Sequence, residues 1–182
     1  YRDTGYDSDF KGWFRSSDSI LDKLWIKAQR TNYVTMRDYF METAGRERKQ
    51  ASADGTIAIL SALYSFDARA RGLMEKFWWE MAAWRLPDGA FLSGVPGNWE
   101  IEFAATNLFM LGELGLWEYY LLTGDLETII QLYSAVRGYL LLYPMLSNGL
   151  VSERLDVTPT DPTNDKADGY DHLENVDGPL MA

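Results

Sequence analysis

The chain has 182 residues, 47% of them hydrophobic and 24% charged, which is the balance of an ordinary globular domain. Its net charge of −10 argues against nucleic acid and against an anionic membrane surface as partners, because both bind basic protein surfaces. The lack of cysteine excludes disulfides and thiol nucleophiles, and the single histidine, His172, argues against a histidine-rich metal site. We predict no metal and no cofactor, and the composition does not assign a compartment.

The first part of the chain leads into a helical domain. Residues 1–16 are polar and irregular, and they form an N-terminal entry segment ahead of residues 17–182, which we expect to be the N-terminal part of a longer helical domain. The Ser-Ser-Asp sequence at 16–18 supplies N-cap chemistry for the first helix. Apolar residues then recur three and four positions apart, which predicts a helix that runs to about Phe40.

A charge-rich stretch, residues 41–55, follows this helix. It holds three carboxylates, Glu42, Glu47 and Asp54, together with three basic residues. Charges crowded between apolar helices are costly unless they are paired, solvated or used in function. Ser52 is the expected N-cap of the second helix, which would place Asp54 in the first turn, where the helix dipole favours negative charge.

The rest of the chain continues as helices. The second helix is expected to break briefly at residues 66–67, and Pro-Asp-Gly at 87–89 ends the third helix. No strand pattern of any length is present, so we predict an all-α fold. The third, fourth and fifth helices are expected over about 68–85, 101–122 and 126–146.

The joints between the predicted helices alternate between long and short. In chain order they are 41–52, 66–67, 87–100, 123–125 and 147–172. Alternate joints of an up-and-down helical array lie at the same end, so the three long joints are expected to gather there. The charged stretch, Trp99 and the Asp-Gly-Tyr-Asp run at 168–171 would then share one mouth, and function usually resides on long loops.

Several of these residues form the motifs of a known family. The motifs are Phe14-Arg15-Ser16-Ser17-Asp18 with Trp25, Gly45-Arg46-Glu47-Arg48 with Asp54-Gly55 after it, Trp99 before a helix, Tyr119-Tyr120 with Thr123-Gly124-Asp125, and Asp168-Gly169-Tyr170-Asp171. Together they resemble the catalytic domain of bacterial α-L-rhamnosidases, inverting glycoside hydrolases with an (α/α)6 barrel, or six-hairpin toroid. The Arg-Glu-Arg core with the downstream Asp is the most specific part, because both its order and its spacing fit.

The resemblance implies a carbohydrate substrate, a terminal α-L-rhamnoside, and roles for individual residues. Glu47 matches the family's general acid, and Asp54 matches a carboxylate that binds the sugar. Glu42 stands where the family usually has an aspartate with the same binding role. Arg48 and Trp99 are further expected sugar contacts. The alternative for the charged stretch is a solvated, self-paired loop, and for Trp99 a buried anchor beneath its loop.

The chain also departs from the family's pattern. An aromatic residue is common at the position of Ala51, and Trp-Pro is common at residues 157–159, where this chain has Val-Thr-Pro. These differences leave open a related (α/α)6 glycosidase for another sugar, or a non-catalytic carbohydrate-binding toroid. The family's general base lies far downstream, so we expect it beyond Ala182, in the remaining half of the barrel. The segment alone is accordingly expected to be inactive and to expose apolar faces.

Overall fold

The structure is a computed structural model, and it describes residues 5–43, 45, 48–96 and 104–152. Helices dominate these residues, which confirms the predicted all-α class. They are α1 (Ser19–Thr35), α2 (Ser52–Ser65), the short η1 (Ala68–Ala70), α3 (Arg71–Ala83), α4 (Ala104–Leu111), the π-helical η2 (Glu113–Trp117), α5 (Glu118–Thr123) and α6 (Leu126–Leu140). The sequence pattern did not predict one short antiparallel ladder, between β1 (Gln50–Ala51) and β2 (Gly94–Val95).

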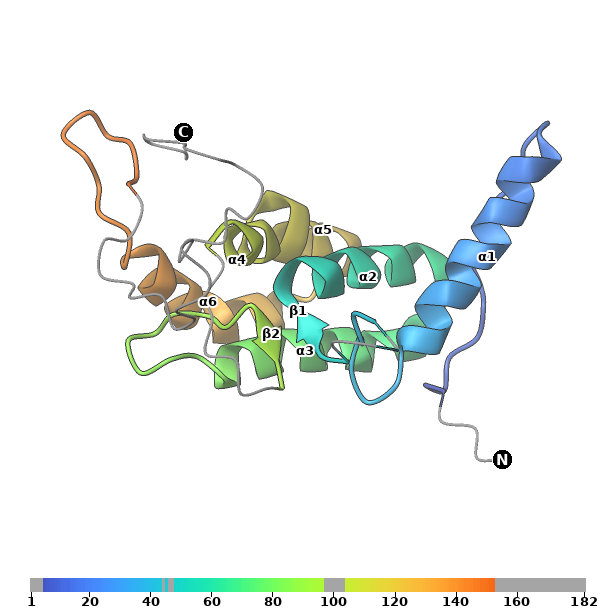
Figure 1. Cartoon of the computed structure of the whole chain (residues 1–182), viewed down its shortest axis with the longest axis horizontal. Coiled ribbons are helices and arrows are strands. Elements are labelled where there is room, and N and C mark those ends of the chain that lie inside the picture. The colour runs from blue at the N-terminus through green and yellow to red at the C-terminus, as the bar shows by residue number, and fades with distance from the viewer. Residues whose placement is uncertain (1–4, 44, 46–47, 97–103, 153–182) are drawn as a thin grey trace.

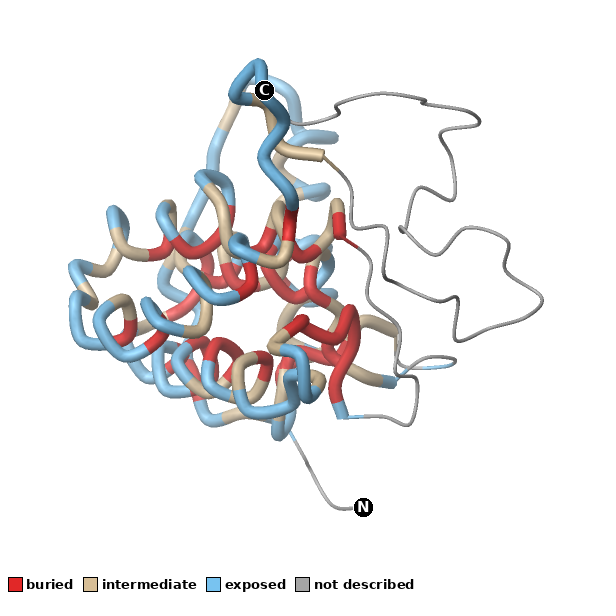
Figure 2. The backbone as a smooth tube through the Cα atoms, turned by 90° about the vertical axis from the view of Figure 1, so that its left-hand side faces the viewer, coloured by how far each residue is buried: buried red, intermediate tan, exposed pale blue. Residues whose placement is uncertain are grey.

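The helices form two packed layers. Figure 1 shows α2, α4 and α5 in one layer and α3 and α6 in the other. The contacts agree, since α2 packs on α4 and α5, α3 packs on α6, and α2 and α3 join the layers. The buried backbone lies mainly between the layers in Figure 2. Side chains from both layers, such as Ile59, Phe77, Met110 and Leu132, belong to one apolar core. If α4, η2 and α5 are taken as one continuous arm, then α2, α3, this arm and α6 alternate between the layers, as in a row of helical hairpins.

Both ends of this row expose apolar side chains. On α1, Ile20 and Leu24 are 70% and 60% exposed, and on α6, Ile130 and Tyr133 are 59% and 64% exposed. An amphipathic helix normally buries such a stripe against a neighbour. α1 and α6 therefore present faces suited to further helices. None of the helices in the described ranges is long and apolar enough to cross a membrane.

The first helix begins as predicted but ends earlier. The Asp18 side chain accepts a hydrogen bond from the backbone N–H of Ile20 at 2.8 Å, which is the expected N-cap. The helix ends at Thr35 instead of about Phe40. Met36 and Phe40 pair in an isolated antiparallel bridge, and both are fully buried. Burial of these two side chains favours a turn of the chain after Thr35, where helix propensity alone would have extended the helix.

The start of the second helix also differs from the prediction. Ser52 is the first residue of α2, and Ala51 occupies the N-cap position without a side-chain bond. The Ser52 backbone N–H donates to the Ser93 carbonyl at 2.9 Å, and its hydroxyl donates to Thr106 at 2.9 Å. Tertiary bonds thus replace local capping. Asp54 lies in the first turn, as predicted.

The later helices show one success and two further corrections. Gly124 is the left-handed C-cap of α5, with φ 69°, and Asp125 is the N-cap of α6. The helix predicted as continuous over 101–122 is interrupted by the π-helical turn η2. Gly115 lies in this turn, and a Cβ there would lie only 1.9 Å from the Met110 carbonyl oxygen, so the close backbone approach requires glycine. α6 ends at Leu140 instead of about residue 146.

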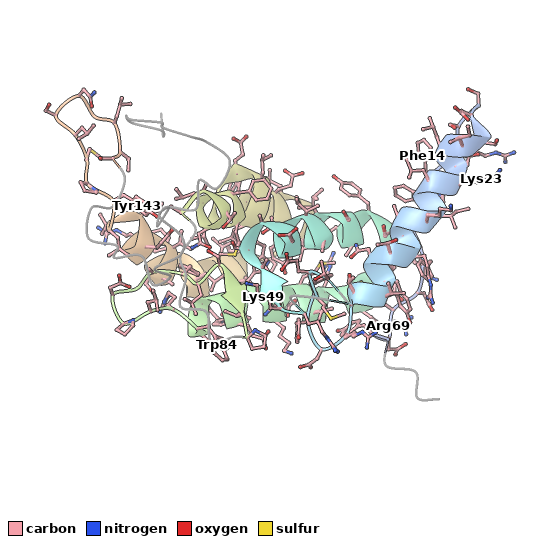
Figure 3. The ribbon with its side chains drawn as sticks, in the orientation of Figure 1. Phe14, Lys23, Lys49, Arg69, Trp84 and Tyr143 are labelled. Carbon is pink, nitrogen blue, oxygen red and sulfur yellow. The ribbon has the colours of Figure 1, made fainter. Side chains whose placement is uncertain are left out.

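The described parts of the first two long joints meet at one end, as predicted, and the second also reaches the end of α6. β1 and β2 belong to the first two long joints, with Gln50 opposite Val95. The ring of Phe91, in the second long joint, contacts Tyr139 at the end of α6 at 5.4 Å between centroids. In Figure 3, Lys49, Trp84 and Tyr143 lie toward this end and Arg69 toward the other. The Asp-Gly-Tyr-Asp run at 168–171 lies outside the described residues.

Arg69 ties the N-terminal segment to the short joint between α2 and α3. Its guanidinium nitrogens lie 2.8 Å from carboxylate oxygens of Asp7, Asp9 and Asp67. The backbone N–H of Asp67 also donates to the Asp9 carbonyl at 3.0 Å. The hydrogen bond from Arg69 lowers the pKa of Asp67 from 3.8 to about 2. The described part of the N-terminal segment is thus held on the helical domain.

This cluster predicts a pH dependence of stability. The pKa of Asp67 is about 2 in the folded protein and 3.8 in an unperturbed chain, so the unfolded state binds more protons as the pH falls. The stabilisation is complete above about pH 4 and is lost toward pH 2. We expect the thermal unfolding midpoints of the unmodified protein and of Asp67→Asn to converge as the pH falls over this range. The control is Lys23→Ala, at an exposed position on α1, whose midpoint should stay equal to that of the unmodified protein at every pH. A constant Asp67→Asn difference down to about pH 2 would contradict this role.

Candidate active site

The first part of the charge-rich stretch is a loop, residues 42–49, whose two ends meet; we call it the charged loop. The backbone N–H of Glu42 donates to the carbonyl of Lys49 at 2.8 Å, which brings the two ends of segment 42–49 together. Compact surface loops whose ends meet in this way are frequently functional. Glu47 belongs to this segment by sequence, but it lies outside the described residues.

Arg48 turns the chain from this loop toward β1. Its φ of 51° makes it the one non-glycine residue in the left-handed region among those the structure describes. This conformation is costly for a residue with a side chain and persists where the surroundings enforce it. The Tyr39 hydroxyl donates to the Arg48 carbonyl at 2.5 Å and helps to hold the turn. Such local strain tends to accumulate at active sites.

A pocket of about 670 Å³ lies between α1 and α2 and reaches this loop. Glu42 and Asp54 both line it. The side-chain amide of Asn32 donates to the Ala58 carbonyl at 3.0 Å, and that of Gln29 donates to the Ser65 carbonyl at 3.3 Å. These bonds hold α1 against α2, and the residues that line the pocket extend along α2 from its first turn to its last.

Two of the predicted sugar-binding residues therefore share one cavity. Glu42 is half-buried, and Asp54 is exposed in the first turn of α2, where the helix dipole favours its negative charge. Two carboxylates that line one cavity can accept hydrogen bonds from the hydroxyls of a sugar. Arg48 is exposed and is not among the pocket-lining residues. Trp99 lies outside the described residues.

The described residues contain no group of three or more acidic or histidine side chains placed to hold a metal ion. The chemistry available in the described part of the site is that of carboxylates, a guanidinium group, hydroxyls and amides.

Gly55, directly after Asp54, lets the start of α2 approach α3 closely. A Cβ at this position would lie 2.3 Å from a ring carbon of Phe77, far inside van der Waals contact. Phe77 is fully buried, so its ring has little room to move away. The Asp54-Gly55 pair thus combines a carboxylate at the pocket with the glycine that seats its helix.

Comparison with known protein families identifies the family of this chain. The model of the bacterial α-L-rhamnosidase six-hairpin glycosidase domain matches residues 9–158. The chain belongs to this family. The match includes the charged loop, the pocket and both layers of helices, and it confirms the resemblance carried by the Arg-Glu-Arg motif at 46–48.

A solved rhamnosidase structure shows the same fold. The crystal structure of the GH78 family rhamnosidase of Bacillus sp. GL1 superposes with a TM-score of 0.66 at 22% sequence identity. The match covers 87% of this chain and 16% of that chain, so the present chain spans a small part of that rhamnosidase. The chain is thus a segment of a six-hairpin toroid. The search of curated proteins found no match.

Sequence reasoning missed the residues that support the loop. Tyr39 bonds to Arg48, as described above, and the side-chain amide of Gln50 donates to Glu80 on α3. Glu80 also pairs with Lys76. The Lys76–Glu80 spacing of four positions on one helix face was visible in the sequence. Tyr39 and Gln50 had no such signal, because their partners are fixed by the path of the loop.

The approach at Gly55 predicts opposite effects for two glycine-to-alanine changes. Gly55→Ala forces a methyl group into Phe77 and is expected to lower the free energy of unfolding by about 1–3 kcal/mol. Gly138→Ala is the matched control in α6, where nothing lies within 4 Å of the added Cβ. It is expected to raise the free energy of unfolding by about 0.5–1 kcal/mol, because alanine favours a helix. Denaturant titration measures both, and a neutral Gly55→Ala would contradict the packing.

Proposed function

We propose that this chain is part of a glycoside hydrolase that cleaves terminal α-L-rhamnosides with inversion, by general acid/base catalysis. The observation that carries the proposal is the presence of Glu42 and Asp54 at one pocket, beside the closed loop that contains Glu47. Membership of the rhamnosidase family supports the reaction class.

The reaction requires two carboxyl groups with opposite tasks. One donates a proton to the leaving oxygen, and the other activates water, at a separation of about 6.5–9.5 Å in inverting enzymes. Glu47 is the proposed proton donor. Neighbouring carboxylates favour the protonated form of such an acid by repelling its charge, and Glu42 and Asp54 are the described groups suited to this effect.

The remaining predicted residues hold the sugar in this proposal. Glu42 and Asp54 accept hydrogen bonds from the sugar hydroxyls, and such bonds are strong because the acceptors are charged. Arg48 donates hydrogen bonds from the rim of the loop. Trp99 stacks on the apolar face of the sugar ring.

The general base is proposed to come from the remaining part of the toroid. The exposed apolar faces of α1 and α6 support this view, because further helices packed against them would continue the row of hairpins. Residues 1–182 alone would then bind one side of the substrate without activating water.

Replacement of the proposed acid tests the mechanism. In the complete protein, Glu47→Gln is expected to lower kcat on methyl α-L-rhamnoside, whose leaving group needs a proton, by about 10²–10⁴-fold, because an amide cannot act as the acid. Binding of L-rhamnose, measured by calorimetry, should persist. Glu113→Gln makes the same change at an exposed position on η2 and is expected to have no effect. Near-normal turnover by Glu47→Gln would refute the assignment of Glu47 as the acid. If the unmodified protein hydrolysed another glycoside faster than the rhamnoside, that sugar would replace rhamnose as the proposed substrate.

Replacement of Asp54 tests the sugar contact separately. Loss of a charge-assisted hydrogen bond is expected to raise KM of Asp54→Asn by about 10–100-fold, with a smaller effect on kcat. The thermal midpoint should change little, because Asp54 is exposed and surface substitutions cost about 0.5 kcal/mol or less. A KM within about twofold of the unmodified protein would argue against this contact.

A further inference from the structure

One lysine on α3 contacts the segment that leads into the charged loop. Lys76 Nζ donates to the Asp38 carbonyl at 2.5 Å and lies 3.0 Å from the Asp38 carboxylate. Asp38 lies between Met36 and Phe40, the two buried residues that turn the chain after α1. Lys76 thus holds the segment that leads into the loop, residues 36–41, against α3. This segment is called the N-terminal stem, and residues 50–51, which follow the loop, are called the C-terminal stem.

The same lysine reaches the other stem through Glu80. Its Nζ lies 3.3 Å from Glu80 Oε1, one helical turn along α3. Glu80 Oε2 accepts a hydrogen bond from the side-chain amide of Gln50 at 2.5 Å. Gln50 is fully buried, and its backbone pairs with Val95 across the β1–β2 ladder. The C-terminal stem is therefore fixed by a side-chain bond and by a ladder at the same residue.

The charges in this network stabilise one another. Burial lowers the pKa of Lys76, but its hydrogen bond to Asp38 and the charge of Glu80 outweigh burial and raise the pKa above 10.5. Lys76 is therefore charged throughout the pH range in which a glycosidase works. Asp38, Lys76, Glu80 and Gln50 form a continuous chain of polar contacts between the two stems.

We propose that Lys76 and Glu80 are positioning residues that set the separation of the two stems of loop 42–49. They thereby position the ends of the loop to which Glu47 belongs by sequence against the first turn of α2, which carries Asp54. This inference rests on the proposed function, because it assigns Glu47 the role of the acid. A displacement of about 1 Å in such a group can cost up to about 10²-fold in rate.

Misplacement of an acid leaves a signature that general loss of structure does not. A rhamnoside with a weakly acidic leaving group needs the proton from Glu47. A dinitrophenyl rhamnoside expels a stable phenolate and needs little help. A fault confined to the acid therefore slows the first substrate much more than the second, whereas partial unfolding slows both equally.

The test uses the complete protein and these two substrates. Lys76→Met removes the charge and keeps most of the apolar stem. We expect its kcat on methyl α-L-rhamnoside to fall about 10–100-fold, with kcat on 2,4-dinitrophenyl α-L-rhamnoside within about threefold and KM little changed. Glu80→Gln keeps an acceptor for Gln50 but loses the ion pair with Lys76. It should show the same selective loss of kcat on methyl α-L-rhamnoside, by a smaller factor than Lys76→Met. Lys23→Met, at an exposed position on α1, is the matched control.

The outcomes separate this inference from the proposed function. Unchanged kcat in Lys76→Met and Glu80→Gln, or equal losses on both substrates, would overturn the positioning role. Glu80→Gln decides the question if Lys76→Met does not fold. Glu47→Gln is measured in parallel on the same substrates. If Glu47→Gln lacks the leaving-group dependence, the proposed acid itself is wrong. If Glu47→Gln shows it and the α3 variants do not, only the positioning role is wrong.

Discussion

The antiparallel pairing of β1 with β2 joins two loops that are far apart in the sequence, and the candidate site depends on it. Gln50 faces Val95 and Ala51 faces Gly94, and Ser52 extends the connection with bonds to Ser93 and Thr106. The charged loop ends where β1 begins, and α2 begins where β1 ends. The ladder therefore sets the position of the loop and of the first turn of α2 at the same time.

The site divides its carboxylates between a rigid element and a tethered one. Asp54 belongs to the first turn of α2, and that turn is seated on Phe77 through the missing side chain of Gly55. Glu42 belongs to a loop whose ends are closed by its own backbone bond to Lys49. In the proposed function, the helix holds the sugar and the loop carries the acid, which requires the loop to be kept in a fixed position. The contacts of Lys76 and Glu80 on α3 with the segments on either side of the loop are proposed to meet this need.

Local signals in the sequence were reliable where the interaction itself is local. Asp18 caps α1 and Asp125 caps α6, because a side chain reaching a backbone N–H two or three residues ahead depends on little else. Gly124 ends α5 for the same reason, since its left-handed φ is a property of one residue. The prediction for Ser52 was wrong because its polar groups found partners at Ser93, just before β2, and at Thr106 on α4, which no local pattern reveals.

The sequence by itself determined the helical class and the order of the joints, which follow from periodicity and capping chemistry. Its motifs also carried the resemblance that identified the family, and that resemblance is the source of the acidic residues predicted for the candidate site. Only the tertiary structure decided that α1 stops at Thr35, that β1 pairs with β2, and that Glu42 and Asp54 line one pocket. The physical reason is that these features arise from burial and hydrogen bonds between segments far apart in the chain, whose free energy exists only once the layers have packed.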